Sequence, residues 1–248
     1  MNVPARLPEM PPPGTASPPF FDLRHVDAAY GPFRALFDVS LAVRAGAVTA
    51  LLGANGAGKT TVARVATGLV RPTAGEVWFE GRRIDAMKPF VIARAGIVHA
   101  PEGRSVFASL SVHENLELSF RRELGRGGVD NALGRAYELF PRLGERSKQI
   151  AGTLSGGEQR MLSLARVMAN PPKLLVADEL SLGLAPIVVD EVYRNLAAIR
   201  DQGTAILLVE QYVGHALAIA DDVAVLSKGT VAHQGPVTDL DEISQFLL

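Results

Sequence analysis

The chain has 248 residues, of which 48% are hydrophobic and 21% are charged, and this composition is typical of an ordinary globular protein. The formal net charge of −1 gives no electrostatic reason to expect nucleic acid, and the absence of cysteine excludes disulfide bonds and thiolate metal sites. No apolar run approaches the roughly 18 residues that cross a membrane, so work at a membrane would require docking to other subunits.

The amino-terminal segment is rich in proline. Residues 1–19 carry seven of the 16 prolines, which predicts a flexible tail. Residues 20–28 and 35–43 then alternate apolar and polar side chains, as half-buried strands do. Tyr30 opens the turn between them, and by itself it fits either a core aromatic or a platform on which a purine stacks.

A glycine-rich loop follows the next predicted strand. The apolar run over 48–52 leads into Gly53, Gly58, Lys59 and Thr60, which match the pattern G-x-x-x-x-G-K-[ST], and a short helix is expected over 62–69. Glycines let backbone N–H groups surround phosphate oxygens, and a helix start adds unpaired N–H groups. Lys59 can reach the outer phosphates and the Thr60 hydroxyl can ligate Mg²⁺. The pattern therefore predicts a nucleoside triphosphate site, with a turn that binds nothing as the alternative.

The middle of the chain changes from mixed to helical character. Strands are expected over 75–80 and 96–99, a helix over 91–95, and a break at 101–104, where ligand groups of parallel sheets gather. From 111 to about 170, strand signals are few. Ser111 and Glu114 have capping-box spacing, and an amphipathic segment over 130–140 is ended by Pro141. We interpret this stretch as a helical lobe inserted into an α/β core.

A second glycine pair opens the helix expected over 158–169. Ser155 and Glu158 have the spacing of a capping box, which is a purely structural interpretation. Gly156 and Gly157 are costly in the first turn of a helix, and they favour the approach of an anion to the backbone. Both interpretations are open at this point.

Two adjacent carboxylates end the buried strand expected over 173–177. Of Asp178 and Glu179, one can hold Mg²⁺ through water while the other polarises an attacking water; a solvated acidic turn is the alternative. The remaining pattern is a helix over 186–201, a strand over 205–209 that ends in Glu210 and Gln211, and a helix over 213–220. A hairpin over 223–233 around Lys228 and a helix over 239–248 follow. This alternation predicts an α/β fold.

The glycine loop, the stretch 154–160 and the pair Asp178–Glu179 together resemble an ATP-binding-cassette (ABC) ATPase over about residues 20 to 235. The stretches 101–107, 182–186 and 208–211 are most similar to ATP-binding subunits of branched-chain amino acid importers, of the LivF type. The resemblance implies an ABC nucleotide-binding domain over 20–248, with a P-loop (RecA-like) core. It also implies an N-terminal antiparallel β subdomain and an inserted α-helical subdomain over about 106–170.

The resemblance also implies roles for individual residues. Tyr30 would stack on adenine. Glu179 would be the general base, assisted by Gln211 and Lys59, and Mg²⁺ would be held by Thr60, Asp178 and Glu102. The phosphates of ATP would be bound by Gly53, Asn55, Gly56, Ala57, Gly58, Lys59, Thr60 and Thr61. The signature that touches the γ-phosphate of an opposing subunit would be formed by Ser155, Gly156, Gly157 and Glu158.

Four positions depart from the wider family. Glu102 stands where most members have glutamine, and Gln211 stands where most have histidine; both are similar to the LivF type. Gln211 can orient the γ-phosphate or water, but it does not titrate near neutral pH. Leu180 replaces a usual proline and is expected to loosen the backbone that aims the base, and Ala185 replaces an aspartate at the dimer interface.

The expected partners follow from the same resemblance. They are a second cassette subunit in a head-to-tail homo- or heterodimer with two ATP at its interface, two transmembrane permease subunits and, indirectly, a periplasmic or extracellular substrate-binding protein. Nucleic acid is not expected. The subunit would work at the cytoplasmic face of the cell membrane. One alternative is the same ATPase subunit in an importer for urea, amides or another solute. The other is a nucleotide-gated scaffold that hardly hydrolyses ATP.

Overall fold

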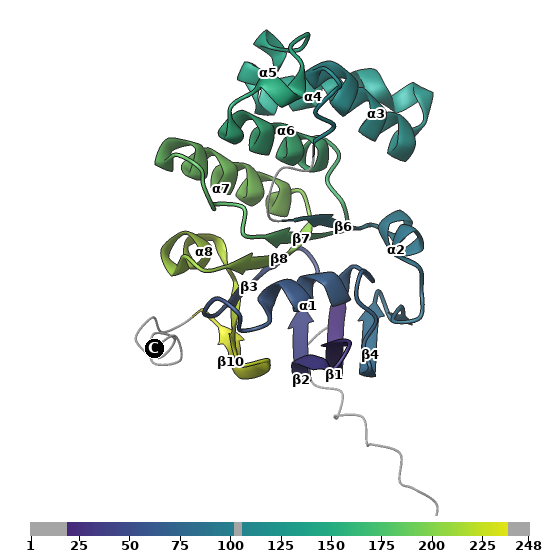
Figure 1. The fold of residues 1–248 in the computed structure, drawn as a ribbon, viewed down its shortest axis with the longest axis vertical. Coiled ribbons are helices and arrows are strands. Elements are labelled where there is room, and N and C mark those ends of the chain that lie inside the picture. Colours follow the sequence, from purple (N-terminus) through teal and green to yellow (C-terminus); the bar gives the residue numbers. More distant parts are fainter. Residues whose placement is uncertain (1–18, 102–105, 238–248) are drawn as a thin grey trace, which may run out of the picture.

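The computed structural model of the chain describes residues 19–101 and 106–237. The helix predicted over 239–248, Glu102 and all but the last residue of the predicted tail lie outside these residues. The described elements are stacked along the long axis of the molecule, with an antiparallel sheet at one end and a group of helices at the other (Figure 1).

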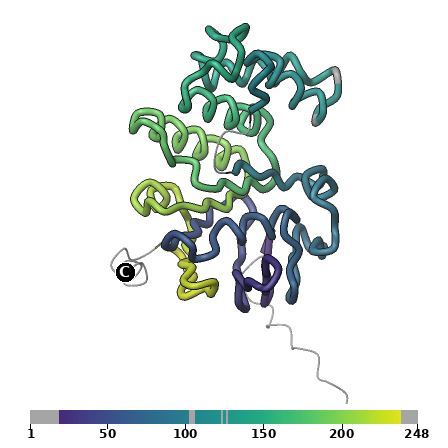
Figure 2. Tube along the Cα trace, viewed as in Figure 1, coloured from purple at the N-terminus to yellow at the C-terminus, as the bar shows by residue number. Residues whose placement is uncertain are grey.

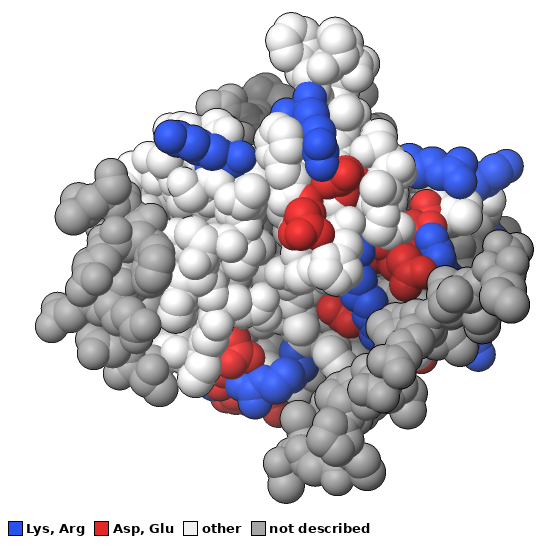
Figure 3. All heavy atoms as spheres, turned by 90° about the horizontal axis from the view of Figure 1, so that it is seen from below, with Lys and Arg blue, Asp and Glu red and all other residues white. Residues whose placement is uncertain are grey.

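The antiparallel sheet has the strand order β2-β1-β4-β5. Its strands are β1 (Phe21–Tyr30), β2 (Phe33–Val43), β4 (Ala74–Phe79) and β5 (Arg82–Arg83). Strand β1 pairs with β2 from Phe21↔Val43 to Tyr30↔Phe33. On the face below this end of the molecule, basic and acidic side chains lie side by side (Figure 3).

The second sheet has the order β10-β9-β3-β8-β7-β6. Its strands are β3 (Val48–Leu52), β6 (Ile97–Ala100), β7 (Leu174–Asp178), β8 (Ala205–Glu210), β9 (Asp222–Ser227) and β10 (Thr230–Pro236). All neighbours are parallel except β9 and β10, which form the predicted hairpin. Strands β3, β7 and β8 are buried along their whole length, as central parallel strands are. Their carboxyl ends meet at one edge, which brings the residues that follow them together.

Helices cover both faces of this sheet and form the separate lobe. The helices outside the lobe are α1 (Lys59–Ala66), α2 (Pro89–Ala95), α7 (Pro186–Asp201) and α8 (Val213–Ile219). The lobe contains α3 (Val112–Leu124), α4 (Val129–Leu139), α5 (Pro141–Glu145) and α6 (Gly156–Met168), with 3-10 turns at Arg126–Gly128 and Ala151–Thr153. None of the helices within the described ranges combines the length and apolarity needed to cross a membrane.

The lobe leaves the sheet after β6 and returns to it at β7, as the trace in Figure 2 shows. Its side chains share one apolar core with α7, α8 and one face of the parallel sheet, whereas the antiparallel sheet and α1 cover the other face. Neighbouring residues of β3 divide accordingly: Leu52 faces the first core and Leu51 the second. The predicted α/β fold with an inserted helical lobe is confirmed, while the boundaries at about 106 and 170 stay a prediction.

Two of the element boundaries that differ from expectation have a clear physical reason. Helix α1 begins at Lys59 instead of residue 62, because Gly58 at its amino end adopts a left-handed conformation (φ 109°) that turns the chain directly into the helix. Pro141 was expected only to end a helix. It is also the first residue of α5, where a proline is tolerated because the first-turn N–H has no partner within the helix.

Candidate nucleotide-binding site

The glycine loop joins the end of β3 to α1 and is fixed by the β9–β10 hairpin. A Cβ atom on Gly53 would lie 2.3 Å from the backbone oxygen of Leu226, so only glycine fits there without a shift. The Gly229 N–H donates to the Ala57 carbonyl at 2.8 Å, which ties the hairpin turn to the loop. The loop conformation is therefore set by a strand pair that lies about 170 residues further along the chain.

Lys59 is held inside this loop. Its side chain is 4% exposed, and Nζ donates to the Gly53 carbonyl at 2.8 Å and to the Ala54 carbonyl at 3.2 Å. The same nitrogen lies 3.5 Å from Oε1 of Glu179. A buried cation that is satisfied by two neutral carbonyls and one carboxylate is well placed to exchange them for phosphate oxygens, which are stronger acceptors.

A cavity of about 740 Å³ opens beside the loop. Eight residues that the sequence assigned to the site line it: Asn55, Gly56, Gly58, Lys59, Thr60, Thr61, Glu179 and Gln211. Six further lining residues were missed: Arg34, Ala35, Phe37, Leu182, Lys228 and Gly229. The missed residues come mainly from β2 and the β9–β10 turn, and only the turn signal at Lys228 and Gly229 could have drawn attention to that region.

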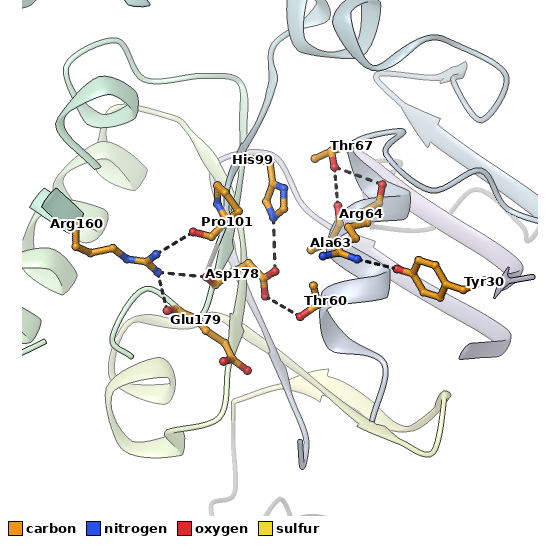
Figure 4. A network of polar contacts seen from close by, with 10 residues as sticks. All are labelled: Tyr30, Thr60, Ala63, Arg64, Thr67, His99, Pro101, Arg160, Asp178 and Glu179. Atoms are coloured by element: carbon orange, nitrogen blue, oxygen red, sulfur yellow. Dashed lines mark hydrogen bonds and ion pairs between the residues drawn. The ribbon is translucent and has the colours of Figure 1, made fainter. Parts of the chain in front are cut away.

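Asp178 ends β7 next to the start of α1. Its carboxylate is 1% exposed, and Oδ1 accepts from the Thr60 hydroxyl at 3.5 Å, as Figure 4 shows. Oxygen ligands of this kind fit Mg²⁺. Within residues 19–101 and 106–237, no three His, Cys, Asp or Glu side chains are placed together so that they could hold a metal ion. A metal at this place would take its other ligands from phosphate oxygens and water.

Glu179 has an unusual backbone conformation (φ 48°) that its surroundings hold in place. Its N–H donates to the Val209 carbonyl at 2.9 Å, and its own carbonyl accepts from Nη2 of Arg160 at 2.7 Å. Arg160 reaches the Asp178 carbonyl as well, and Leu180 is fully buried in the core. The segment is thus anchored by a buried side chain and by Arg160, which the sequence analysis did not single out.

Glu210 connects the two strand ends that carry Glu179 and Gln211. Its carboxylate is 1% exposed and accepts from the N–H of Ser181 at 3.3 Å and from the Ser181 hydroxyl at 3.0 and 3.1 Å. Burial raises the pKa of the nearby Tyr193 hydroxyl, and the charge of Glu210 adds to this shift. The sequence placed Glu210 at a strand end but gave no sign of its partner Ser181.

This combination of loop, buried lysine and strand-end carboxylates agrees with the comparisons to known proteins. The sequence profile of the ABC transporter family matches residues 36–181. The chain belongs to the ABC transporter family. It is 41% identical to BraG, the high-affinity branched-chain amino acid transport ATP-binding protein of Pseudomonas aeruginosa. The alignment spans 207 residues and covers 83% of this chain and 88% of BraG.

Two further comparisons agree with this assignment. The chain is 34% identical over 222 residues to LivF of Archaeoglobus fulgidus, a probable branched-chain amino acid transport ATP-binding protein, with 89% of this chain and 94% of LivF covered. A solved ATP-binding subunit of an ABC transporter superposes with a TM-score of 0.80 at 25% identity, covering 91% and 92% of the two chains. The predicted family, the fold class and the ATP hydrolase class are confirmed.

The residues predicted to form the signature lie at and just before the start of α6. Ser155 and Glu158 form the predicted capping box, in which the N–H and hydroxyl of Ser155 hold the pKa of the Glu158 carboxyl below its usual range. Arg146 pairs with the same carboxylate at 3.2 Å. Among the described residues that line the cavity, none belongs to the stretch from Ser155 to Glu158. Their binding roles stay predictions.

Tyr30 ends β1 and is 40% exposed. Its hydroxyl accepts from Arg64 on α1 at 3.4 Å, and it is not among the residues that line the cavity. The ABC ATPase thus leaves this ring accessible beside the helix that follows the loop, and stacking on adenine stays a prediction.

Proposed function

We propose that this ABC ATPase is the ATP-hydrolysing subunit of an importer for branched-chain amino acids and works as a dimer docked to two permease subunits at the cytoplasmic face of the membrane. The observation that carries the catalytic part is the position of Lys59, buried in the glycine loop and 3.5 Å from Glu179 in the same cavity as Gln211. BraG and LivF, whose names state branched-chain amino acid transport, support the substrate.

The residues predicted to act in hydrolysis would divide the work among them. The N–H groups of the loop and the ammonium group of Lys59 bind the phosphates and stabilise the charge that develops on them. Glu179 accepts a hydrogen bond from the attacking water and polarises it, while the Gln211 amide orients the water or the γ-phosphate. Thr60 and Asp178 would hold Mg²⁺, which neutralises phosphate charge when bound.

The separation of the signature from the cavity supports a dimer. In a head-to-tail dimer, Ser155, Gly156 and Gly157 of one subunit would close the cavity of the other, so that two ATP lie at the interface. The N–H groups of Gly156 and Gly157 in the first turn of α6 would suit a γ-phosphate. ATP would close the dimer, and hydrolysis would reopen it and move the permease subunits.

A nucleotide-gated scaffold is the second candidate, and Gln211 in place of a titratable histidine is the observation that favours it. Phosphate release by the purified chain separates the two. Sustained release that Lys59→Ala abolishes supports the enzyme; no release above background, or release that Lys59→Ala leaves unchanged, contradicts it. The substrate is tested by reconstitution with the permease subunits and binding protein encoded by neighbouring genes: ATP-driven uptake of labelled leucine supports the proposal, and uptake of urea or an amide alone contradicts it.

A further inference from the structure

Asp178 has a second neighbour on the side away from the glycine loop. His99 lies in β6, which pairs in parallel with β7 so that His99 stands opposite Val176, two residues before Asp178. The His99 ring points at the Asp178 carboxylate, and its Nε2 atom lies 3.6 Å from Oδ2 (Figure 4). The imidazole therefore faces one carboxylate oxygen while Thr60 faces the other.

Both facing atoms are buried, and neither has a hydrogen-bond partner in the part of the chain that the structure describes, since the 3.6 Å between them is slightly longer than a hydrogen bond. The His99 side chain is 11% exposed and Asp178 is 1% exposed, so water does not substitute freely for a protein partner. A buried polar atom without a hydrogen bond destabilises the fold, and a buried charged atom does so more strongly. A small movement of the imidazole toward the carboxylate would satisfy both atoms with one hydrogen bond.

We propose that His99 is a positioning residue that donates a hydrogen bond from Nε2–H to Oδ2 of Asp178 and thereby turns Oδ1 toward Thr60 and the metal of MgATP. This inference rests on the proposed function, because the proposed function assigns a bound Mg²⁺ to Asp178. It uses the neutral imidazole with the proton on Nε2 and needs no change of protonation. Side chains that hydrogen-bond to a metal ligand orient that ligand, and their loss typically lowers metal affinity about 10–100-fold.

His99 does not line the 740 Å³ cavity; it lines a separate cavity of about 310 Å³ together with Ser163. Its substitution should therefore act on the metal through Asp178 and leave the contacts of the nucleotide itself in place. This separation allows the inference to be tested by comparing metal affinity with metal-free nucleotide affinity.

The experiment measures Mn²⁺ affinity by electron paramagnetic resonance in the presence of a non-hydrolysable ATP analogue, and nucleotide affinity in EDTA with a fluorescent ATP. His99→Leu removes the donor, whereas His99→Gln places an amide N–H near the position of Nε2. We expect His99→Leu to weaken Mn²⁺ binding about 10–100-fold with unchanged nucleotide affinity in EDTA, and His99→Gln to restore most of the loss. Ser163→Ala, which alters the same small cavity, should leave both affinities unchanged.

Three results overturn the inference: wild-type metal affinity in His99→Leu, equal losses in His99→Leu and His99→Gln, or a parallel loss of metal-free nucleotide binding. Nitrogen-15 NMR of the wild-type imidazole provides a test that does not depend on the folding of a variant. Protonated Nε2 with unprotonated Nδ1 is expected, and the opposite tautomer overturns the inference. If nucleotide binding by the wild-type protein does not depend on metal, the metal part of the proposed function is overturned. If it does depend on metal but His99→Leu binds Mn²⁺ as tightly as wild type, only the inference is overturned.

Discussion

Ser181→Ala removes the hydroxyl that satisfies the buried carboxylate of Glu210. That carboxylate accepts two contacts from the Ser181 hydroxyl, at 3.0 and 3.1 Å, and one from the Ser181 N–H at 3.3 Å. A hydrogen bond to a charged group contributes about 1.5–3 kcal/mol, so we expect the free energy of unfolding to fall by about 2 kcal/mol. For a domain of this size the unfolding midpoint should fall by about 4–8 °C.

The assay is urea unfolding followed by circular dichroism, with Ser109→Ala as the matched control. Ser109 is exposed, and its substitution should change the unfolding free energy by less than about 0.5 kcal/mol. In a Glu210→Gln background the cost of Ser181→Ala should shrink, because a neutral amide loses less when its partner is removed. The reasoning is refuted if Ser181→Ala is as stable as Ser109→Ala, or if its cost is the same in both backgrounds.

Three further predictions concern the loop and the signature. Lys59→Ala should weaken ATP binding about 10- to 100-fold in calorimetry, because charge-assisted hydrogen bonds to phosphate are lost; unchanged affinity would contradict this. Gly56→Ala should cost about 1–2 kcal/mol of stability, since its φ is 79° but its Cβ would meet no atom within 4 Å; Gly53→Ala should cost more, because its Cβ meets backbone at 2.3 Å. Equal thermal shifts of the two variants would contradict this ranking. The lowered pKa of Glu158 means that its contacts with Ser155 stabilise the fold above the ordinary glutamate pKa of about 4.3 and lose this effect as pH falls through the folded value. Ser155→Ala should therefore differ from wild type most at pH 7 and least near pH 3, and a difference that grows on acidification would be the wrong result.

The parts that the sequence predicted well are local. The strand, glycine loop and helix around Lys59 follow from a contiguous pattern, and the capping boxes at Ser111 and Ser155 follow from a spacing of three residues. The meeting of Asp178 and Gln211 with the loop was predictable because parallel strands end at one edge of a sheet. These features depend on neighbours along the chain or on a general rule of sheet topology.

The parts that the sequence left out depend on contacts between segments that are distant along the chain. Strand β3 lies between β8 and β9 in the sheet, so nothing local reveals that Lys228 lines the cavity. Strands β6 and β7 are neighbours in both chain and sheet, but the whole helical lobe lies between them along the chain, and no local pattern shows that His99 faces Asp178. The partner of Glu210 is hidden because Ser181 lies 29 residues away, with α7 between the two strands. Leu180, which was expected to loosen the backbone that aims the base, is fully buried beside Glu179, and its effect on that backbone stays a prediction.

The role of Glu179 as the base is tested by the rate at which Glu179→Gln releases phosphate, measured together with its affinity for ATP. Because general-base catalysis contributes about 10²–10⁴-fold, we expect the release rate to fall by that factor. ATP affinity should stay close to that of wild type, since Lys59 and the loop are untouched. A Glu179→Gln protein that releases phosphate at the wild-type rate would show that Glu179 is not the base.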